Sequence, residues 1–245
     1  MAVLLSPPEN YVGSKWCAGC GHGIFTRLVH EVMREKGLTD KNICMNGVGC
    51  SANYHNSVTG GNQVDCHHGR AVSTAIGAKS MLPEVCVWTY QGDGDAYAIG
   101  MGETILTAQQ GWPVTVFVIN NCNYGMTGGQ AAPTTLLGQV TTTTPFGNRF
   151  EPFEAMTTLK TLDGVGYLAR GSTHDAASIR QLKKYISKAI DCQMVGHKYA
   201  LVEVLCPCPT NWHKTPLDAA DWVRDEMTKV FPLGEYVGAE VKEWK

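Results

Sequence analysis

The chain has 245 residues, of which 44% are hydrophobic and 17% charged, and its formal net charge is −2 at pH 7. A chain of this length can bury one substantial core, so we expect a single α/β domain over residues 1–245. The charge balance offers no basic surface for nucleic acid.

Targeting and membrane signals also point to a cytoplasmic enzyme or binding protein. The longest strongly apolar run, Val114 to Ile119, is far too short to span a membrane. The stretch from Met1 to Pro8 lacks the basic region of a signal peptide. We therefore expect the ten cysteines to be thiols or metal ligands rather than disulfides.

The first part of the chain alternates helices and strands. An irregular arm over residues 1–15 precedes a predicted helix around Ile24 to Met33, which ends near Gly37. A short strand follows over 43–49, and the polar segment 53–66 is predicted to be a loop. A second helix is expected over 71–81, because Pro83 stops it.

The central and last parts complete a parallel sheet. Strands over 85–91 and 114–119 flank a helix that ends at Gly111, the right-handed crossover that neighbouring parallel strands need. After Gln130 comes a long Thr-, Gly- and Pro-rich loop, of a length that is usually functional or lies against a partner. The remaining predicted elements are a strand at 162–169, a helix at 174–192, a strand at 199–205, and a helix at 218–231 before a tail that we expect to pack on a partner. We expect helices on both faces of the sheet.

Two polar turns follow the central strands. Gly92-Asp93-Gly94-Asp95 comes directly after one strand, and Asn120-Asn121-Cys122-Asn123 after the next. These turns meet at the carboxyl edge of a parallel sheet, where ligands of open α/β sheets bind. Their carboxylate, carboxamide and carbonyl oxygens suit Mg²⁺, and the following helix N-terminus suits a phosphate. The alternative is an ordinary turn whose aspartate caps a helix.

Several cysteines occupy turns and strand ends. Cys17 and Cys20 form a C-x-x-C pair, Cys50 follows Gly47-Val48-Gly49, and Cys206 and Cys208 flank Pro207. A C-x-x-C pair alone is compatible with zinc, an iron–sulfur cluster or a redox disulfide. Four thiolates converging on one edge suit a [4Fe–4S] cube, and a structural zinc site would use the same thiols. The other cysteines are most simply small buried hydrophobic residues.

These motifs together resemble a known family. Gly92-Asp93-Gly94 followed by Asn120-Asn121 is similar to the thiamine diphosphate fingerprint. With the continuation 124–130 and Pro133-Thr-Thr, the chain from about residue 16 to 212 resembles the β subunit of 2-oxoacid:ferredoxin oxidoreductases. The resemblance is greater to the 2-oxoglutarate and branched-chain 2-oxoacid branches than to the pyruvate branch, and it implies a diphosphate-type thiamine diphosphate-binding domain, with an N-terminal cysteine turn and a C-terminal helical tail.

The resemblance also implies which residues hold the metals. The Mg²⁺ ligands would be Asp93, Asn121 and the carbonyl of Asn123. The [4Fe–4S] ligands would be Cys17, Cys20, Cys50 and Cys208. Cys206 competes with Cys208 for the fourth position, and Cys208 is preferred because it matches the family's Pro-Cys-Pro-Thr motif. Ala18 and Val48 replace the family's Pro and Ile without removing a ligand.

Further candidates surround these ligands. The catalytic candidates are His68, Arg70 and Thr127; a polar helix start is the alternative role of the first two. His22 is either a helix cap or an acid–base group. Met126 replaces an Asn of the pyruvate enzymes, which favours a larger or more apolar substrate. The cofactor-binding set implied by the resemblance is Cys20, Gly49, Cys50, Ser51, His68, Gly92, Asp93, Gly94, Asp95, Asn121, Asn123, Tyr124, Gly125, Met126 and Thr127.

The implied activity is oxidative decarboxylation of a 2-oxoacid to acyl-CoA and CO₂, with coenzyme A as co-substrate and electrons passing to ferredoxin or a ferredoxin-like subunit. An α subunit would carry the pyrimidine-binding domain and the activating glutamate, because Glu103 lies on the crossover helix, at the wrong end of the cofactor. Two alternatives stay open. A non-oxidative thiamine diphosphate decarboxylase or carboligase explains the turns, and a zinc-stabilised Cys₄ assembly module explains the cysteines.

Overall fold

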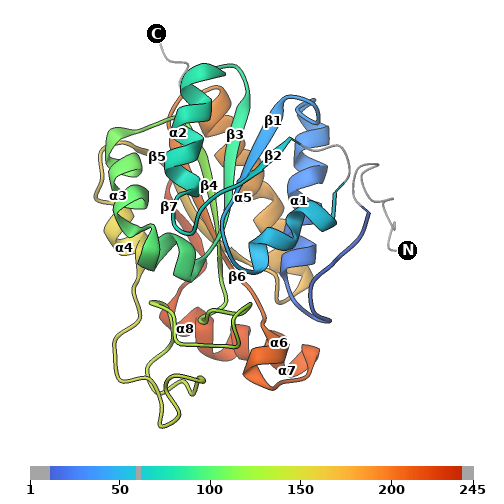
Figure 1. Ribbon diagram of the computed structural model, residues 1–245, viewed down its shortest axis with the longest axis vertical. Coiled ribbons are helices and arrows are strands. Elements are labelled where there is room, and N and C mark those ends of the chain that lie inside the picture. The colour runs from blue at the N-terminus through green and yellow to red at the C-terminus, as the bar shows by residue number, and fades with distance from the viewer. Residues whose placement is uncertain (1–11, 59–61, 239–245) are drawn as a thin grey trace.

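The computed structural model describes residues 12–58 and 62–238. Six parallel strands and one antiparallel strand form a single sheet in the order β2-β1-β3-β4-β6-β5-β7, and helices cover both of its faces (Figure 1). The strands are β1 (Asn42–Asn46), β2 (Gln63–Asp65), β3 (Cys86–Gly92), β4 (Thr115–Asn120), β5 (Val165–Ser172), β6 (Tyr199–Leu205) and β7 (Gly234–Val237). The α-helices are α1 (His22–Glu35), α2 (Ala71–Met81), α3 (Met101–Gln110), α4 (Ala155–Leu159), α5 (Ala176–Met194), α6 (Pro209–Trp212), α7 (Pro216–Trp222) and α8 (Thr228–Val230).

Alternate residues of the strands form two separate cores. Trp88, Tyr90 and Phe117 pack with α1 and α5 on one face, whereas Val87 and Val116 pack with α2, α3 and α4 on the other. This alternation is the two-residue period of a strand buried on both sides. Right-handed crossovers explain the two layers, because the chain runs from β1 to β3 and β4 in one direction and from β5 back to β6 in the other.

The strand register brings four strand ends to one edge. Gly92 at the end of β3 pairs with Ile119 of β4, and Asn120 at the end of β4 pairs with Leu205 of β6. The turns after β3, β4 and β6, together with the loop after β1, therefore lie side by side. Beyond this edge lie α6, α7, α8 and the long segment after Gln130 (Figure 1).

Most of the predicted elements are confirmed. Helix α2 and strand β6 have the predicted bounds, and β3 and β4 are parallel neighbours joined by a crossover helix. This helix has a π-type first turn, Asp95–Ile99, before α3 begins after Gly100. Strand β5 begins at Val165, later than the sequence pattern indicates, because 162–164 still belong to the turn before it.

Four predictions are corrected by the structure. The segment 53–66 is not all loop, since a 3-10 helix spans Cys50–Asn56 and β2 forms the sheet edge; residues 59–61 lie outside the described part. The long loop leads into the unpredicted helix α4. The last helix is divided by a π-type turn, Val223–Met227. The described part of the tail forms the unpredicted strand β7 against β5, and its packing on a partner stays a prediction.

Two further observations complete the description of the fold. Of the predicted arm, residues 1–11 lie outside the described part and 12–15 form no regular element. Among the described residues, no helix combines the length and the apolar character that crossing a membrane requires.

A buried ion-pair network joins the last strand to the centre of the sheet. Arg170 of β5 is fully buried and pairs with Glu203 of β6 and with Glu154 before α4. It also donates to the Tyr236 hydroxyl of β7 at 3.0 Å. Glu203, in turn, accepts a hydrogen bond of 3.0 Å from the Asn120 side chain at the end of β4. Every charge in this network therefore has a partner, as burial requires.

We predict that Arg170→Met destabilises the chain by about 3 to 5 kcal/mol, because it leaves Glu203 buried without its cation. Urea unfolding followed by circular dichroism measures the change. The matched control is Arg224→Met, which removes an exposed arginine that pairs with Asp221 and Asp225. Equal unfolding midpoints for the two variants would contradict the stabilising role of the network.

Candidate functional site

A pocket opens at the carboxyl edge of β3 and β4. It encloses about 520 Å³, part of which is open to solvent. His22 and Val48 complete the lining, and its other residues all belong to the set predicted from the sequence: Gly49, Cys50, Ser51, His68, Gly92, Asp93, Gly94, Asp95, Asn121, Asn123, Tyr124, Gly125, Met126 and Thr127. The fold thus brings together residues from the loop after β1, the turn before α2 and the turns after β3 and β4.

Asp93 is a buried carboxylate that forms no ion pair with any residue in the described part of the chain. Its side chain is 2% exposed and accepts a hydrogen bond from the Thr134 hydroxyl. Burial raises the pKa of Asp93 to about 7, and the bonds from Thr134 and from the backbone of Gly94 oppose that shift. A buried carboxylate beside the Asn121 carboxamide in a pocket wall is a hard oxygen donor set that fits Mg²⁺, whose charge would offset the cost of burying Asp93.

The turn after β4 is held by its own asparagines. The side-chain oxygen of Asn120 accepts from the backbone N–H of Cys122 at 3.1 Å, and that of Asn121 accepts from the N–H of Asn123 at 3.4 Å. These local bonds hold Cys122 in the left-handed region, with φ 54°, which non-glycine residues rarely adopt. The Asn211 side chain supports the turn from α6, because it donates to Asn123 Oδ1 at 3.3 Å and to the Gly125 carbonyl at 2.7 Å.

Asp95 ties three of the loops together. Its Oδ1 accepts backbone N–H groups from Val48 at 3.3 Å and from Gly69 at 2.8 Å, and it also contacts Nδ1 of His68. Its Oδ2 accepts the Gln91 side-chain amide at 2.5 Å. Asp95 lines the pocket, but its carboxylate oxygens are hydrogen-bonded to other protein groups. These hydrogen bonds hold the surrounding loops in position.

The predicted cluster cysteines lie around one edge of the same pocket. Burial, and next the charges of Cys20, Cys208, Cys17 and Asp93, raise the pKa of Cys50 to about 12, so the other three thiols lie near enough to Cys50 to influence its ionisation. Cys208 lies next to Asn123, with 4.0 Å between its Sγ and Asn123 Oδ1. A set of four thiols from three separate loops fits the ligand requirement of a [4Fe–4S] cluster.

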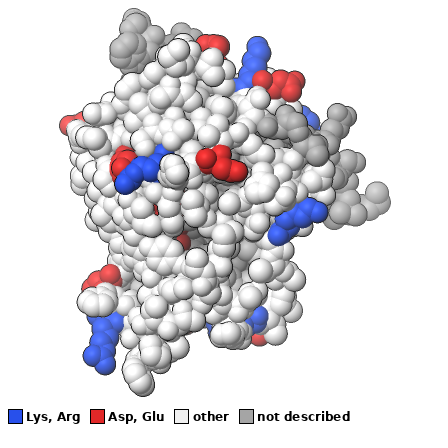
Figure 2. Space-filling model, in the orientation of Figure 1, with Lys and Arg blue, Asp and Glu red and all other residues white. Residues whose placement is uncertain are grey.

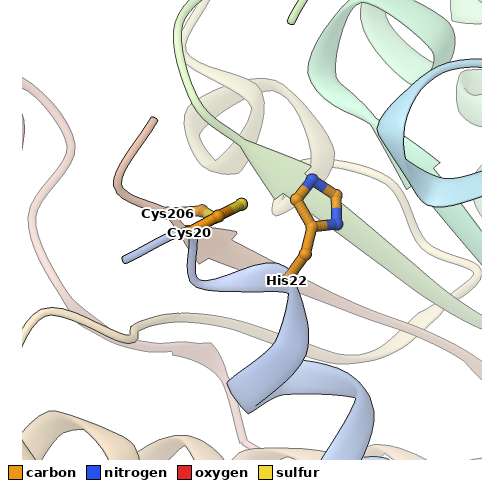
Figure 3. Close-up of side chains that lie close together, drawn as sticks. All are labelled: Cys20, His22 and Cys206. Carbon is orange, nitrogen blue, oxygen red and sulfur yellow. The ribbon is translucent and has the colours of Figure 1, made fainter. Parts of the chain in front are cut away.

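Cys206 has a different setting from Cys208. It is fully buried, its sulfur lies within 4.8 Å of that of Cys20 (Figure 3), and its thiol donates to the Pro207 carbonyl at 3.5 Å. The neighbouring Cys206 thiol lowers the pKa of Cys20, whereas burial raises the pKa of Cys206. Cys20 is therefore the thiol of the pair that more readily becomes a thiolate. The cysteines interpreted as buried small residues, Cys44, Cys66, Cys86, Cys122 and Cys192, are all buried.

Four sequence candidates lie outside the pocket lining, namely Arg70, Cys17, Cys20 and Cys208. Arg70 is exposed and pairs with Glu103 of α3 at 2.5 Å. Thr127 lies in the lining, where its hydroxyl donates to Gln130 at 2.6 Å.

Sequence reasoning missed the supporting roles of Thr134 and Asn211. Thr134 lies within the Pro133-Thr-Thr motif, and Asn211 directly follows Pro-Cys-Pro-Thr. Position relative to those motifs was the only available signal, because the contacts join loops that are remote along the chain.

The chain is similar to several known proteins. Residues 47–204 match the family model described as "Thiamine pyrophosphate enzyme, C-terminal TPP binding domain". Subunit VorA of the ketoisovalerate oxidoreductase of Methanothermobacter thermautotrophicus is 40% identical, over 90% of this chain and 47% of the relative. Subunit KorB of the 2-oxoglutarate synthase of Archaeoglobus fulgidus is 36% identical, over 87% of this chain and 77% of the relative. The chain thus spans about half the length of the VorA relative and most of the KorB relative.

A solved structure is similar over nearly the whole chain. It is a 2-oxoglutarate:ferredoxin oxidoreductase from Magnetococcus marinus with 2-oxoglutarate, coenzyme A and succinyl-CoA bound. The TM-score is 0.80 with 25% sequence identity, and the match covers 98% of this chain and 87% of that one. The family resemblance inferred from the motifs is thereby confirmed. The chain belongs to the thiamine diphosphate-binding β subunits of the 2-oxoacid:ferredoxin oxidoreductase family.

Proposed function

We propose that this chain is the thiamine diphosphate-, Mg²⁺- and [4Fe–4S]-binding subunit of a cytoplasmic 2-oxoacid:ferredoxin oxidoreductase, and that it forms one domain. The observation that carries the proposal is the contact between two candidate sites. Asn123 belongs to the turn of the metal ligands, and its side chain lies 4.0 Å from the sulfur of Cys208. A decarboxylation site and an electron-transfer site would therefore share a wall.

Different residues of the chain would hold the two cofactors of the reaction. When bound, thiamine diphosphate supplies the nucleophilic carbon and the electron sink for decarboxylation, and an iron–sulfur cluster supplies one-electron steps. Asp93, Asn121 and the carbonyl of Asn123 would hold Mg²⁺ against the diphosphate. Cys17, Cys20, Cys50 and Cys208 would hold the cluster. The acyl group would be transferred to coenzyme A, and the electrons would pass to ferredoxin.

The substrate would be a branched-chain 2-oxoacid or 2-oxoglutarate. The relatives named for ketoisovalerate and for 2-oxoglutarate support this class. Met126 lines the pocket with 49% of its surface exposed, so an apolar side chain faces the space above the metal ligands. This favours a branched-chain substrate. His68, which contacts Asp95 in the pocket wall, and Thr127 remain the candidates for substrate contact.

A partner subunit would complete the active site. The ordered segment after Gln130 exposes four large apolar side chains, Leu137, Val140, Phe146 and Phe150, of which Phe146 is 90% exposed. Internal bonds fix this segment; for example, the Asn148 amide donates to the Thr135 carbonyl at 2.7 Å. On the face shown in Figure 2, the end of the molecule to which this segment belongs carries few charged residues. We infer that it docks the α subunit, with its pyrimidine-binding domain and activating glutamate, beside the pocket.

The first prediction concerns the metal. Asp93→Ala should abolish measurable binding of thiamine diphosphate with Mg²⁺, because it removes the anionic ligand, and Asn121→Ala should weaken binding less. Calorimetric titration of the iron-loaded chain measures both. Asp40→Ala, which changes an exposed aspartate far from the pocket, is the control. Wild-type affinity in Asp93→Ala would rule out the metal assignment.

The second prediction concerns the cluster. Serine at position 17, 20, 50 or 208 should remove most of the iron and the broad absorption near ~400 nm, because each change deletes a thiolate ligand. Cys192→Ser should retain both, since that buried thiol bonds to the carbonyls of Lys198 and Tyr199. Colourless wild-type protein containing zinc would favour the assembly module instead.

The third prediction tests the complete function. The isolated chain, supplied with thiamine diphosphate, Mg²⁺, coenzyme A and a panel of 2-oxoacids, should not reduce a low-potential dye, and adding the α subunit should restore turnover. Phe146→Ser should weaken this reconstitution at least about tenfold, whereas Met81→Ser, which changes another highly exposed apolar residue on α2, should not. Robust turnover by the isolated chain would refute the split active site. Aldehyde release without dye reduction would favour the non-oxidative enzyme.

A further inference from the structure

Asn120, the first residue of the Asn-Asn pair, has no place in the pocket lining. It ends β4 and is fully buried, whereas Asn121 and Asn123 line the pocket. Its side-chain NH₂ group donates to Oε1 of Glu203 on β6 at 3.0 Å, and its side-chain oxygen accepts from the backbone N–H of Cys122 at 3.1 Å. Asn120 thus joins the buried ion-pair network to the turn that carries two of the proposed Mg²⁺ ligands.

The carboxylate of Glu203 determines which way round the Asn120 carboxamide lies. A carboxylate paired with an arginine can only accept hydrogen bonds, so the NH₂ group of Asn120 faces Glu203 and its oxygen faces the turn. The second oxygen of Glu203 accepts from the Nε–H of Arg170, which is fully buried as well. Both carboxylate oxygens therefore have donors, and a hydrogen bond in so buried a place is stronger than one in water.

The side-chain oxygen of Asn120 holds the turn in its unusual conformation. It accepts from the backbone N–H of Cys122 and also from its thiol at 3.4 Å, and the backbone of Cys122 has φ 54°. A non-glycine residue keeps such an angle only where its surroundings fix it. The Thr135 hydroxyl fixes the Cys122 carbonyl at 2.8 Å. Because Cys122 stands between Asn121 and Asn123, its conformation sets the directions of both proposed ligands.

We propose that Glu203 is a positioning residue for the Mg²⁺–thiamine diphosphate site, acting through the carboxamide of Asn120. The inference rests on the proposed function, because it needs that cofactor in the pocket. In Glu203→Gln, Arg170 would retain the new amide oxygen, so the new NH₂ group would face the NH₂ group of Asn120. The Asn120 side chain would then turn over and lose its bond to the Cys122 N–H.

The experiment exchanges the donor and the acceptor between the two positions. Glu203→Gln places two NH₂ groups against each other, and Asn120→Asp places two carboxylates against each other. In the double variant the carboxylate at position 120 accepts from the amide at 203 and from the Cys122 N–H, so donors and acceptors match again. Calorimetric titration of the full iron-loaded chain with thiamine diphosphate and Mg²⁺ should show at least about tenfold weaker binding in each single variant, and recovery to within about threefold of the wild type in the double variant.

Glu154→Gln is the matched control. Glu154 is the other carboxylate paired with Arg170, and its hydrogen bonds go to Arg170 and to the N–H of Thr157 rather than to Asn120. This variant should bind the cofactor with wild-type affinity.

A second readout needs no cofactor. Hydrogen–deuterium exchange of the cofactor-free chain is followed by mass spectrometry of peptides that cover residues 120–124. Exchange there should be at least about fivefold faster in Glu203→Gln and close to the wild-type rate in the double variant, with peptides from α2 unchanged. A general loss of stability would raise exchange across the sheet, and the second substitution would not repair it.

Two results would overturn the inference alone. One is wild-type affinity and exchange in a folded Glu203→Gln chain, and the other is a double variant that binds no better than the single variants. If Glu203→Gln does not fold, the double variant decides: restored folding and binding support the inference, and failure of either contradicts it. A wild-type chain that does not bind thiamine diphosphate with Mg²⁺ would overturn the proposed function as well, so the two failures are distinguishable.

Discussion

The buried carboxylate of Asp95 is the constraint on which the rest of the pocket depends. It sits in the first turn after β3 and accepts hydrogen bonds from the loop after β1, from the turn before α2 and from Gln91 of β3. Each of those loops contributes residues to the lining. A carboxylate that is 2% exposed is costly to bury unless its oxygens are satisfied, so the folded chain has little freedom to move any of the three loops separately.

This constraint explains why glycines occupy particular positions around the pocket. A Cβ at Gly47 would lie 2.5 Å from Asp95 Oδ2, so a larger residue there would push the loop after β1 away from the carboxylate. Gly69, with φ +75°, allows its N–H to point at Oδ1 while its Cα passes close to Gly100. The shape of the pocket is thus fixed by close backbone approach before any ligand enters, which is the usual basis of pre-organised binding.

The sequence predicted the sheet from local patterns, and it predicted the membership of the pocket from the family resemblance that the turn motifs carry. Apolar runs marked β3, β4 and β6, and a parallel sheet places the turns after them at one edge. It could not show β7, whose four residues lack a strand pattern and whose Tyr236 is joined to the core by a hydrogen bond from Arg170. Residue chemistry alone could not separate the roles of Asp93 and Asp95, since two residues of one turn differ only in where the fold points them; the family resemblance was what assigned Asp93 to the metal. The same limit applies to Cys206 and Cys208, which follow one strand yet lie in different surroundings.

The short separation between the metal turn and the cysteine edge has a consequence for chemistry. Asn211 of α6 donates to Asn123 and Gly125, and its amide lies 3.6 Å from the sulfur of Cys208. One carboxamide therefore fixes the distance between the proposed metal ligands and a proposed cluster ligand. Electrons that leave a decarboxylated substrate at the pocket would reach the cysteine edge through the turn wall, with no moving element between them. Because the turn, α6 and β6 belong to one packed body, oxidation and decarboxylation would be coupled by fixed geometry. A conformational change would be needed only to admit the substrate and the partner.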